Sequence, residues 1–120
     1  MNNYKWTIFS IGTWNRKTFP DTNAKEQRIK AVREAREYYE ANTYDEKIKE
    51  LADFYIVNAG LAGRFADEGG QLVCDLIRET PMWFEVNQAV QEKMEINSQR
   101  KWHKEDGEWR HVNEKAKSNV

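Results

Sequence analysis

Apolar side chains recur along the chain with the spacing of helices. Residues 50–61 carry apolar side chains on every side of a helical wheel, which predicts a helix buried all round. Residues 24–41 are rich in Glu, Lys, Arg and Ala, all strong helix formers, and predict a long helix before it. We find no convincing period-two alternation of the kind that half-buried strands show. The pattern therefore predicts an all-α fold.

Two of the expected helices form a hairpin in the first half of the chain. A breaker cluster at residues 19–23 precedes the helix over 24–41. A short break follows, in which Thr43 or Asp45 would cap the next helix, over about 46–61. Long helices joined by so short a break pack antiparallel. We therefore expect these two helices to face each other.

The other expected helices are bounded by Gly and Pro. A first helix is expected over about residues 4–16, and the two glycines at 69–70 predict a loop before a short helix over 71–78. A last long helix is expected over about 81–100, with Thr at its N-cap and Pro at its first position. The polar tail from about residue 103 is expected to be irregular. Together these elements predict a small bundle of four to five helices.

The composition fits one domain over residues 1–120, with a modest core that makes an oligomer plausible. Charged residues make up 32% and hydrophobic residues 39%, with five each of Trp, Tyr and Phe. That balance is too aromatic for a disordered chain and too charged for a membrane protein. The formal net charge of −1 provides no general field for attracting a nucleic acid polymer. An anionic ligand must therefore be held by local chemistry.

The expected location is the cytoplasm of a bacterial or phage-infected host cell. Cys74 is the single cysteine, so an intramolecular disulfide is excluded and a reducing compartment is the natural interpretation. The N-terminal segment lacks the charged-then-apolar pattern of a signal peptide, and no apolar run approaches the length of a membrane span.

Two carboxylates stand out within the apolar helix. Glu50 and Asp53 are three residues apart on one face, which Val57 and Leu61 continue. Because an uncompensated buried charge is very costly, these carboxylates need cations. Either Lys and Arg side chains form structural salt bridges with them, or they bind a metal ion.

A second acidic pair, Glu34 and Glu37, lies on the preceding helix with the same spacing. In isolation such a pair commonly faces solvent. Twelve residues separate Glu37 from Glu50, which permits a tight helical hairpin that brings the two pairs together. Four converging carboxylates repel one another, and a hard divalent cation with oxygen ligands relieves that repulsion. The two pairs together favour a Mg²⁺ site, with Mn²⁺ as the alternative ion.

The last long helix carries one face that changes from apolar to cationic, through Val86, Val90, Lys93, Asn97 and Arg100. Because Lys93 and Arg100 continue an apolar face, we expect them to lie at the border of a site and to bind phosphate groups there. Asn97 is a candidate ligand for phosphate oxygen or sugar. The alternative is that Lys93 and Arg100 neutralise the acids of the apolar helix. Trp14 is a candidate to stack on a base, as is Phe19, although such rings more often belong to the core.

The order Glu-x2-Glu, twelve residues, Glu-x2-Asp resembles the signature of the MazG-like all-α nucleoside triphosphate pyrophosphohydrolases. Flanking segments extend the resemblance, over roughly residues 14–111, to a phage-type branch described as dATP/dGTP pyrophosphohydrolase domains. The segments are Trp14-x4-Phe19-Pro20 before the acidic helices and Lys93-x3-Asn97-x2-Arg100-x-Trp102 after them, followed by Asp106, Gly107 and His111. Residues 63–80 depart from the expected pattern, with a run that looks like a local insertion.

The resemblance implies a helical bundle that works as a homodimer or homotetramer. It also implies Mg²⁺-dependent cleavage of a nucleoside triphosphate between the α- and β-phosphates, giving a monophosphate and pyrophosphate. Glu34, Glu37, Glu50 and Asp53 would bind the metal or orient the attacking water, and Glu37 or Glu34 would accept its proton. Two other functions stay open: a non-enzymatic helical interaction or adaptor protein of phage origin, and a house-cleaning hydrolase of non-standard nucleotides.

Overall fold

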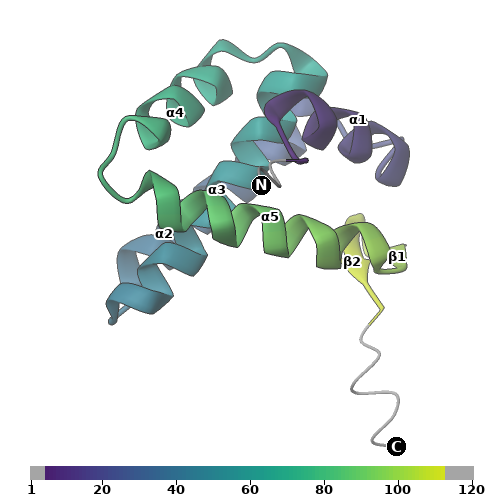
Figure 1. The fold of residues 1–120 in the computed structure, drawn as a ribbon. Helices are drawn as coiled ribbons and strands as arrows, with labels where there is room; N and C mark the ends of the chain where they lie inside the picture. Colours follow the sequence, from purple (N-terminus) through teal and green to yellow (C-terminus); the bar gives the residue numbers. More distant parts are fainter. Residues whose placement is uncertain (1–4, 113–120) are drawn as a thin grey trace, which may run out of the picture.

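The computed structural model describes residues 5–112, which form five helices followed by one β-hairpin (Figure 1). The elements are α1 (Ile8–Thr18), α2 (Ala24–Glu40), α3 (Tyr44–Phe65), α4 (Glu68–Arg78), α5 (Trp83–Gln99), β1 (Trp102–Glu105) and β2 (Glu108–His111). The protein is a small helical bundle, and the predicted all-α class is confirmed. Within residues 5–112, no helix is long and apolar enough to cross a lipid bilayer.

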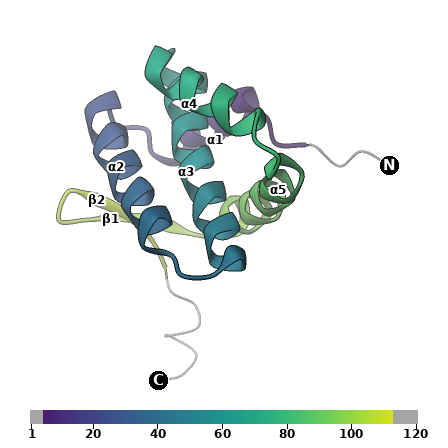
Figure 2. The same ribbon diagram turned by 90° about the vertical axis from the view of Figure 1, so that its left-hand side faces the viewer.

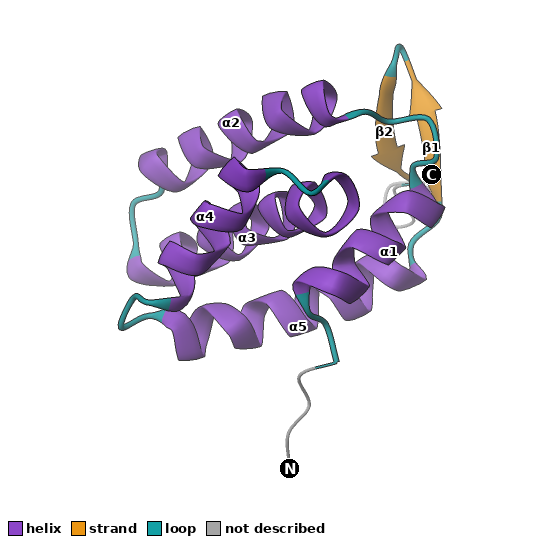
Figure 3. Cartoon of the chain, turned by 90° about the horizontal axis from the view of Figure 1, so that it is seen from above, coloured by secondary structure: helices purple, strands orange, loops and turns teal. Residues whose placement is uncertain are grey.

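Helix α3 is the centre of the bundle. It packs against α1, α2, α4 and α5, and α2 and α5 lie on opposite sides of it (Figures 2 and 3). This burial on all sides agrees with the apolar wheel of the sequence: Ala52 and Ala59 are fully buried, and Leu61 is 2% exposed. Helices α1, α4 and α5 contribute buried residues to the main core, among them Ile11, Cys74, Val86, Val90 and Met94. The buried Ala31 of α2 packs with Val57 and Leu61 of α3 in a second cluster.

Helices α1 and α3 are in backbone contact where two glycines face each other. A Cβ atom at Gly12 would lie 2.5 Å from the carbonyl carbon of Gly63, so no larger residue fits there without a shift of the helices. This close approach brings the C-terminal end of α1 down onto α3. As a result, Trp14 and Asn15 face the side of α3 that carries the carboxylates.

The N-terminal ends of α1 and α3 follow the capping rules. The Thr43 hydroxyl accepts from the backbone N–H of Glu46, so the prediction that Thr43 caps α3 is confirmed. The helix begins two residues earlier than expected and continues to Phe65. Helix α1 begins at Ile8 with Thr7 as its cap, so it starts later than the expected residue 4, which lies outside the described residues.

The expected loop at Gly69 and Gly70 is wrong, because both residues belong to α4. Asp67 caps this helix by accepting from the Gly70 N–H at 2.8 Å. Gly70 is buried against α3, where an added Cβ would lie 2.8 Å from the carbonyl oxygen of Asn58. The absence of a side chain at residue 70 therefore serves close helix packing, and the chain does not turn there.

The expected start of the last long helix is also wrong. Helix α5 begins at Trp83, and its N-cap residue Met82 makes no side-chain capping bond. The Thr80 hydroxyl instead donates to the Ile77 carbonyl at 2.8 Å, at the end of α4. Thr80 and Pro81 therefore lie just after the end of α4, in the connection to α5. This connection makes one more turn before α5 starts.

The tail expected to be irregular forms a β-hairpin over residues 102–111. Strands β1 and β2 are antiparallel, with Trp102 opposite His111 and Glu105 opposite Glu108. Asp106 and Gly107 at the turn have φ angles of 51° and 78°, which an Asp-Gly pair adopts readily in a two-residue hairpin turn. The hairpin lies at one end of the bundle, next to the loop between α1 and α2 (Figure 3).

Candidate functional site

Three of the four predicted carboxylates converge between α2 and α3. Glu34 of α2 and Glu50 and Asp53 of α3 each place one carboxylate oxygen within 4.8 Å of the other two. The antiparallel packing of the two helices brings them together, as the helical hairpin predicted. All three residues are half-buried. We call these three side chains the carboxylate cluster.

The carboxylate cluster has more negative charge than its neighbours neutralise. Glu34 Oε1 and Glu50 Oε1 are shielded from solvent, and neither has a hydrogen-bond partner among the described residues. Asp53 Oδ1 is 3.1 Å from the ammonium nitrogen of Lys93 on α5. The alternative salt-bridge interpretation therefore accounts for Asp53 but leaves an oxygen of each glutamate without a partner. Unpaired buried carboxylate oxygens are rare, because their desolvation is costly.

The crowding changes the acidity of the cluster. Burial, followed by repulsion from Asp53 and Glu37, raises the pKa of Glu34 to about 7. Burial and the Asp53 charge also raise the pKa of Glu50. Burial raises the pKa of Asp53, although the nearby Lys93 ammonium acts in the opposite direction. The three groups therefore bind protons more strongly than ordinary carboxylates, and they would bind another cation at the same place for the same reason.

Glu37 differs from the other predicted ligands. Its side chain is exposed, and it does not belong to the group of oxygens within 4.8 Å. It still acts on the cluster: its carboxylate lies within hydrogen-bonding range of Glu50 and raises the pKa of that group, and its charge raises the pKa of Glu34. Glu37 thus lies at the solvent side of the cluster, next to it but outside it.

A cleft of about 460 Å³ opens from the carboxylate cluster toward the β-hairpin. Glu34 and Asp53 line it at one end, and helices α1, α2, α3 and α5 and the hairpin all contribute to its walls. Aromatic rings line the other end, from α1, the following loop and the hairpin: Trp14, Phe19, Trp102 and Trp109. These rings pack edge-on or tilted, with Phe19 5.0 Å from Trp102 between ring centroids and 5.5 Å from Trp109.

The four residues predicted to bind substrate lie at or beside this cleft. Trp14, Asn97 and Arg100 line it, and Lys93 is bound to Asp53 next to it. The Arg100 guanidinium donates to Asn97 Oδ1 at 3.2 Å and makes no ion pair with a carboxylate among residues 5–112. The predicted neutralisation of the acids therefore involves Lys93 and does not involve Arg100. Phe19 is 3% exposed, so it is a core ring of the aromatic cluster.

Two residues of α2 that sequence analysis missed also line the cleft. Lys30 and Gln27 precede Glu34 by four and seven residues, which places them on the same helix face. Burial lowers the pKa of Lys30, and its ammonium makes no ion pair within the described part of the chain. Their spacing from Glu34 was the signal in the sequence that could have identified them as residues of this site. Arg110 and His111 of β2 complete this wall, and only the unpredicted hairpin brings them there.

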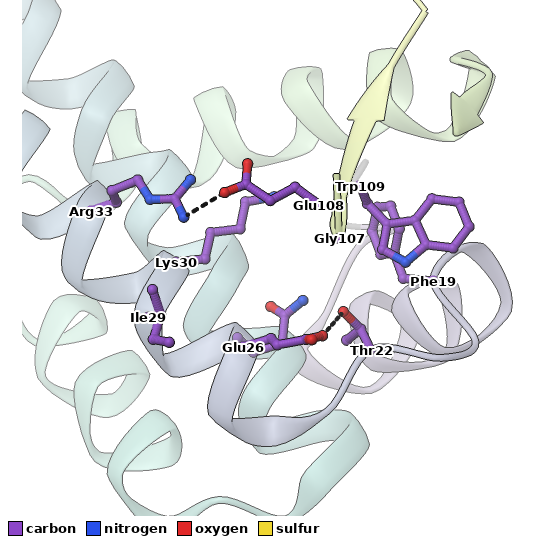
Figure 4. A pocket seen from close by; sticks show the side chains of 10 residues that line it. Phe19, Thr22, Glu26, Ile29, Lys30, Arg33, Gly107, Glu108 and Trp109 are labelled. Atoms are coloured by element: carbon purple, nitrogen blue, oxygen red, sulfur yellow. Dashed lines mark hydrogen bonds and ion pairs between the residues drawn. The ribbon is translucent and has the colours of Figure 1, made fainter. Parts of the chain in front are cut away.

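A smaller cavity of about 250 Å³ lies between α2 and the hairpin (Figure 4). It shares four lining residues with the cleft: Phe19, Gln27, Lys30 and Trp109. Glu108 of β2 reaches across to Arg33 of α2, at 3.3 Å. On the hairpin, the Trp109 indole N–H donates to Asp21 Oδ1 at 2.9 Å, and Lys104 pairs with the other Asp21 oxygen at 2.7 Å. These contacts hold the hairpin against α2 and against the loop that precedes it.

Arg64 holds the loop that carries Phe19 in place. Its guanidinium donates to five oxygens of residues 15–22: Asn15 O and Oδ1, Phe19 O, Pro20 O and Thr22 O, at 2.8–3.3 Å. The charge-assisted bonds to Asn15 also fix the direction of its amide, so that the Asn15 oxygen faces Arg64. The wall of the cleft is therefore built on an arginine that belongs to a run the sequence suggested was a local insertion.

We predict that Arg64→Ala lowers the free energy of unfolding by about 2–4 kcal/mol, because it leaves several carbonyl oxygens without a donor. Urea unfolding followed by tryptophan fluorescence measures this change. Arg36→Ala is the matched control, since Arg36 is exposed and makes no ion pair among residues 5–112; its effect should stay within about 0.5 kcal/mol. Equal stability of the two variants would show that the Arg64 contacts do not stabilise the loop.

Comparisons of the chain with protein-family models, with curated proteins and with solved structures gave no match.

Proposed function

We propose that this protein is a Mg²⁺-dependent nucleoside triphosphate pyrophosphohydrolase of the MazG-like all-α type. It would cleave between the α- and β-phosphates and release a nucleoside monophosphate and pyrophosphate. The observation that carries the proposal is the pair of buried, unpartnered oxygens of Glu34 and Glu50 beside Asp53. The resemblance of the acidic spacing supports the same conclusion.

The carboxylate cluster fits a hard divalent cation. It offers oxygen atoms only, from three carboxylates within 4.8 Å, and Lys93 is the one ammonium that pairs with it among residues 5–112. Mg²⁺ and Mn²⁺ prefer such ligands, and Mg²⁺ commonly shares them with the phosphates of a substrate. Glu34, Glu50 and Asp53 are therefore the proposed metal ligands. When bound, the ion would balance charge on the triphosphate and lower the pKa of water.

Glu37 is the proposed general base. An exposed carboxylate next to the cluster, but outside it, remains free to take the proton of the attacking water at one of its oxygens. Glu34 is the alternative base, because the other two carboxylates would then hold the cation. Lys93 holds Asp53 in place from the α5 side, and this fixes the orientation of one ligand.

Cationic side chains of the cleft would bind the triphosphate. Lys30, Arg100 and Arg110 all line it, and Lys30 makes no ion pair in the described part of the chain. An anion of several charges next to Lys30 would restore the ordinary pKa that burial has lowered. Asn97 would complete this border by a hydrogen bond to a phosphate or sugar oxygen.

The test is a substrate panel with Mg²⁺ in which pyrophosphate and orthophosphate are measured separately. The panel holds the four deoxynucleoside triphosphates, the four ribonucleotides, and oxidised or methylated nucleotides that a house-cleaning enzyme would prefer. We expect release of pyrophosphate without orthophosphate, and its loss when the metal is chelated. No release from any member of the panel would overturn the proposal and favour the non-enzymatic interaction protein.

We also propose that the protein forms a homodimer or homotetramer. Exposed apolar side chains on α2 and α4 support this, among them Val32 at 61%, and Leu72 and Leu76 at 58% each. Exposed apolar surface of this kind commonly marks a protein–protein contact when it forms a patch. Light scattering coupled to gel filtration should give a mass of two or four chains. Replacing Leu72 and Leu76 together by Glu should give a single chain, and a monomeric parent protein would contradict the proposal.

A further inference from the structure

Gln27 places a side-chain amide in the wall of two cavities. The residue is 6% exposed, it lines both the cleft and the smaller cavity, and its side chain makes no hydrogen bond with the described residues. The buried polar atoms without a partner among residues 5–112 belong to Glu34 and Glu50, so the Gln27 amide keeps contact with the solvent in these cavities. An amide at the wall between two cavities is placed to bond with a ligand.

The position of Gln27 relative to the carboxylate cluster is set by helix α2. Gln27, Lys30 and Glu34 follow one another at steps of three and four residues, so they share one face. The helical rise places Gln27 about 10 Å from Glu34 along the axis, with Lys30 between them. That separation is close to the distance between the 5′-phosphate and the outer edge of the base in a nucleotide.

The surroundings of Gln27 suit a flat aromatic ligand. Phe19 and Trp109 share its wall, and their ring centroids are 5.5 Å apart. Trp109 is only half-buried, and its indole N–H is held by Asp21, so the ring keeps a fixed orientation with part of its surface in the cavities. Aromatic surface next to a hydrogen-bonding amide is the combination that proteins use to bind unpaired bases.

We propose that Gln27 binds the base of the nucleotide. The inference rests on the proposed function, since it takes the cluster end of the cleft for the triphosphate. Lys30 contacts the phosphates, and the Gln27 amide makes two hydrogen bonds to the edge of the base beside Trp109. An amide offers one donor and one acceptor side by side, which matches an edge where an acceptor and a donor are adjacent.

Two substitutions of Gln27 test this assignment. Gln27→Leu removes both hydrogen bonds and keeps a good helix former in a partly apolar wall. Gln27→Glu leaves only acceptors, which favours a base with two adjacent donors, as guanine has, over thymine, which has a single donor between two acceptors. Gln88→Leu is the matched control, because Gln88 is exposed on α5 and lines neither cavity. Thermal unfolding shows that each variant folds.

The first readout is the dissociation constant of the four deoxynucleoside monophosphates, measured by calorimetric titration without any need for turnover. Gln27→Leu should raise the dissociation constant of the preferred monophosphate by at least about tenfold. Gln88→Leu should leave that constant within about twofold of the wild-type value. Gln27→Glu should shift the preference toward guanine. Wild-type affinity in Gln27→Leu, or an unchanged order of bases in Gln27→Glu, would overturn the inference.

The second readout is the binding of inorganic tripolyphosphate with Mg²⁺, which has no base. It should be the same for wild type and Gln27→Leu, because the substitution lies away from the phosphate end. Equal weakening of tripolyphosphate and monophosphate would overturn the assignment to the base. Failure of the wild type to bind tripolyphosphate with Mg²⁺ or to hydrolyse any triphosphate would instead overturn the proposed function, independently of the monophosphate result.

Discussion

Asp53→Asn is expected to lower the rate of pyrophosphate release at least about a hundredfold. The substitution removes one negative charge from the carboxylate cluster and the partner of Lys93, so both the cation and the ammonium lose a ligand. Initial rates with saturating Mg²⁺ measure the loss. Asp45→Asn is the matched control on the same helix, because Asp45 is exposed and lies in its first turn, away from the cluster. Full activity of Asp53→Asn would refute its role.

Comparison with Glu37→Gln separates metal binding from proton transfer. If Glu37 is the general base, Glu37→Gln lowers kcat by about a hundredfold or more but leaves the stabilisation by Mg²⁺ unchanged. Asp53→Asn should lose both the activity and the stabilisation by Mg²⁺. A Glu37→Gln variant that no longer gains stability from Mg²⁺ would show that Glu37 is a metal ligand, as the spacing of the acidic pairs suggested.

Glu34→Gln is expected to make the metal-free protein more stable at neutral and alkaline pH. In the folded chain the pKa of Glu34 is raised from its ordinary value of 4.5 to about 7, by burial first and then by Asp53 and Glu37. The folded state therefore binds this proton more strongly than the unfolded state does. Stability from this group is fully present below about pH 4.5 and is lost as the pH rises through about 7. At roughly pH 8 the neutral glutamine should raise the free energy of unfolding by about 1–3 kcal/mol relative to the wild type.

Chemical unfolding of wild type and Glu34→Gln with a metal chelator, at several pH values, measures this difference. The gap between the two proteins should grow from about pH 5 to about pH 8. Addition of Mg²⁺ should reverse the order, because the wild type gains stability from a bound ion and the variant does not. Lower stability of Glu34→Gln at alkaline pH without metal would show that Glu34 is a structural partner in the fold.

The residue pattern of the helices that carry the carboxylate cluster was enough to predict them. The apolar wheel around Glu50 and Asp53 required burial on all sides, and α3 has that burial because four helices surround it. The same argument predicted that a carboxylate on this helix needs a cation. Lys93 was found because the apolar face of α5 continues into it, and it pairs with Asp53.

Other features were hidden for physical reasons. Each strand of the hairpin has only four residues, with a single tryptophan among polar side chains, so Asp106 and Gly107 at the turn were the only strong local signal for it. Gln27 and Lys30 are ordinary residues of a charged helix, and their burial depends on the hairpin lying over them. The glycine at residue 70 led to the wrong prediction of a loop. In sequence, a glycine that permits close packing of helices looks the same as one that permits a turn.

The most direct test of the account is hydrolysis in water enriched in oxygen-18, with the products analysed by mass spectrometry. If the carboxylate cluster directs water to the α-phosphorus of a triphosphate, the label enters the nucleoside monophosphate and the pyrophosphate stays unlabelled. Incorporation should require Mg²⁺ and disappear in Asp53→Asn. Label in the pyrophosphate, release of orthophosphate, or no turnover at all would contradict the assignment of this site.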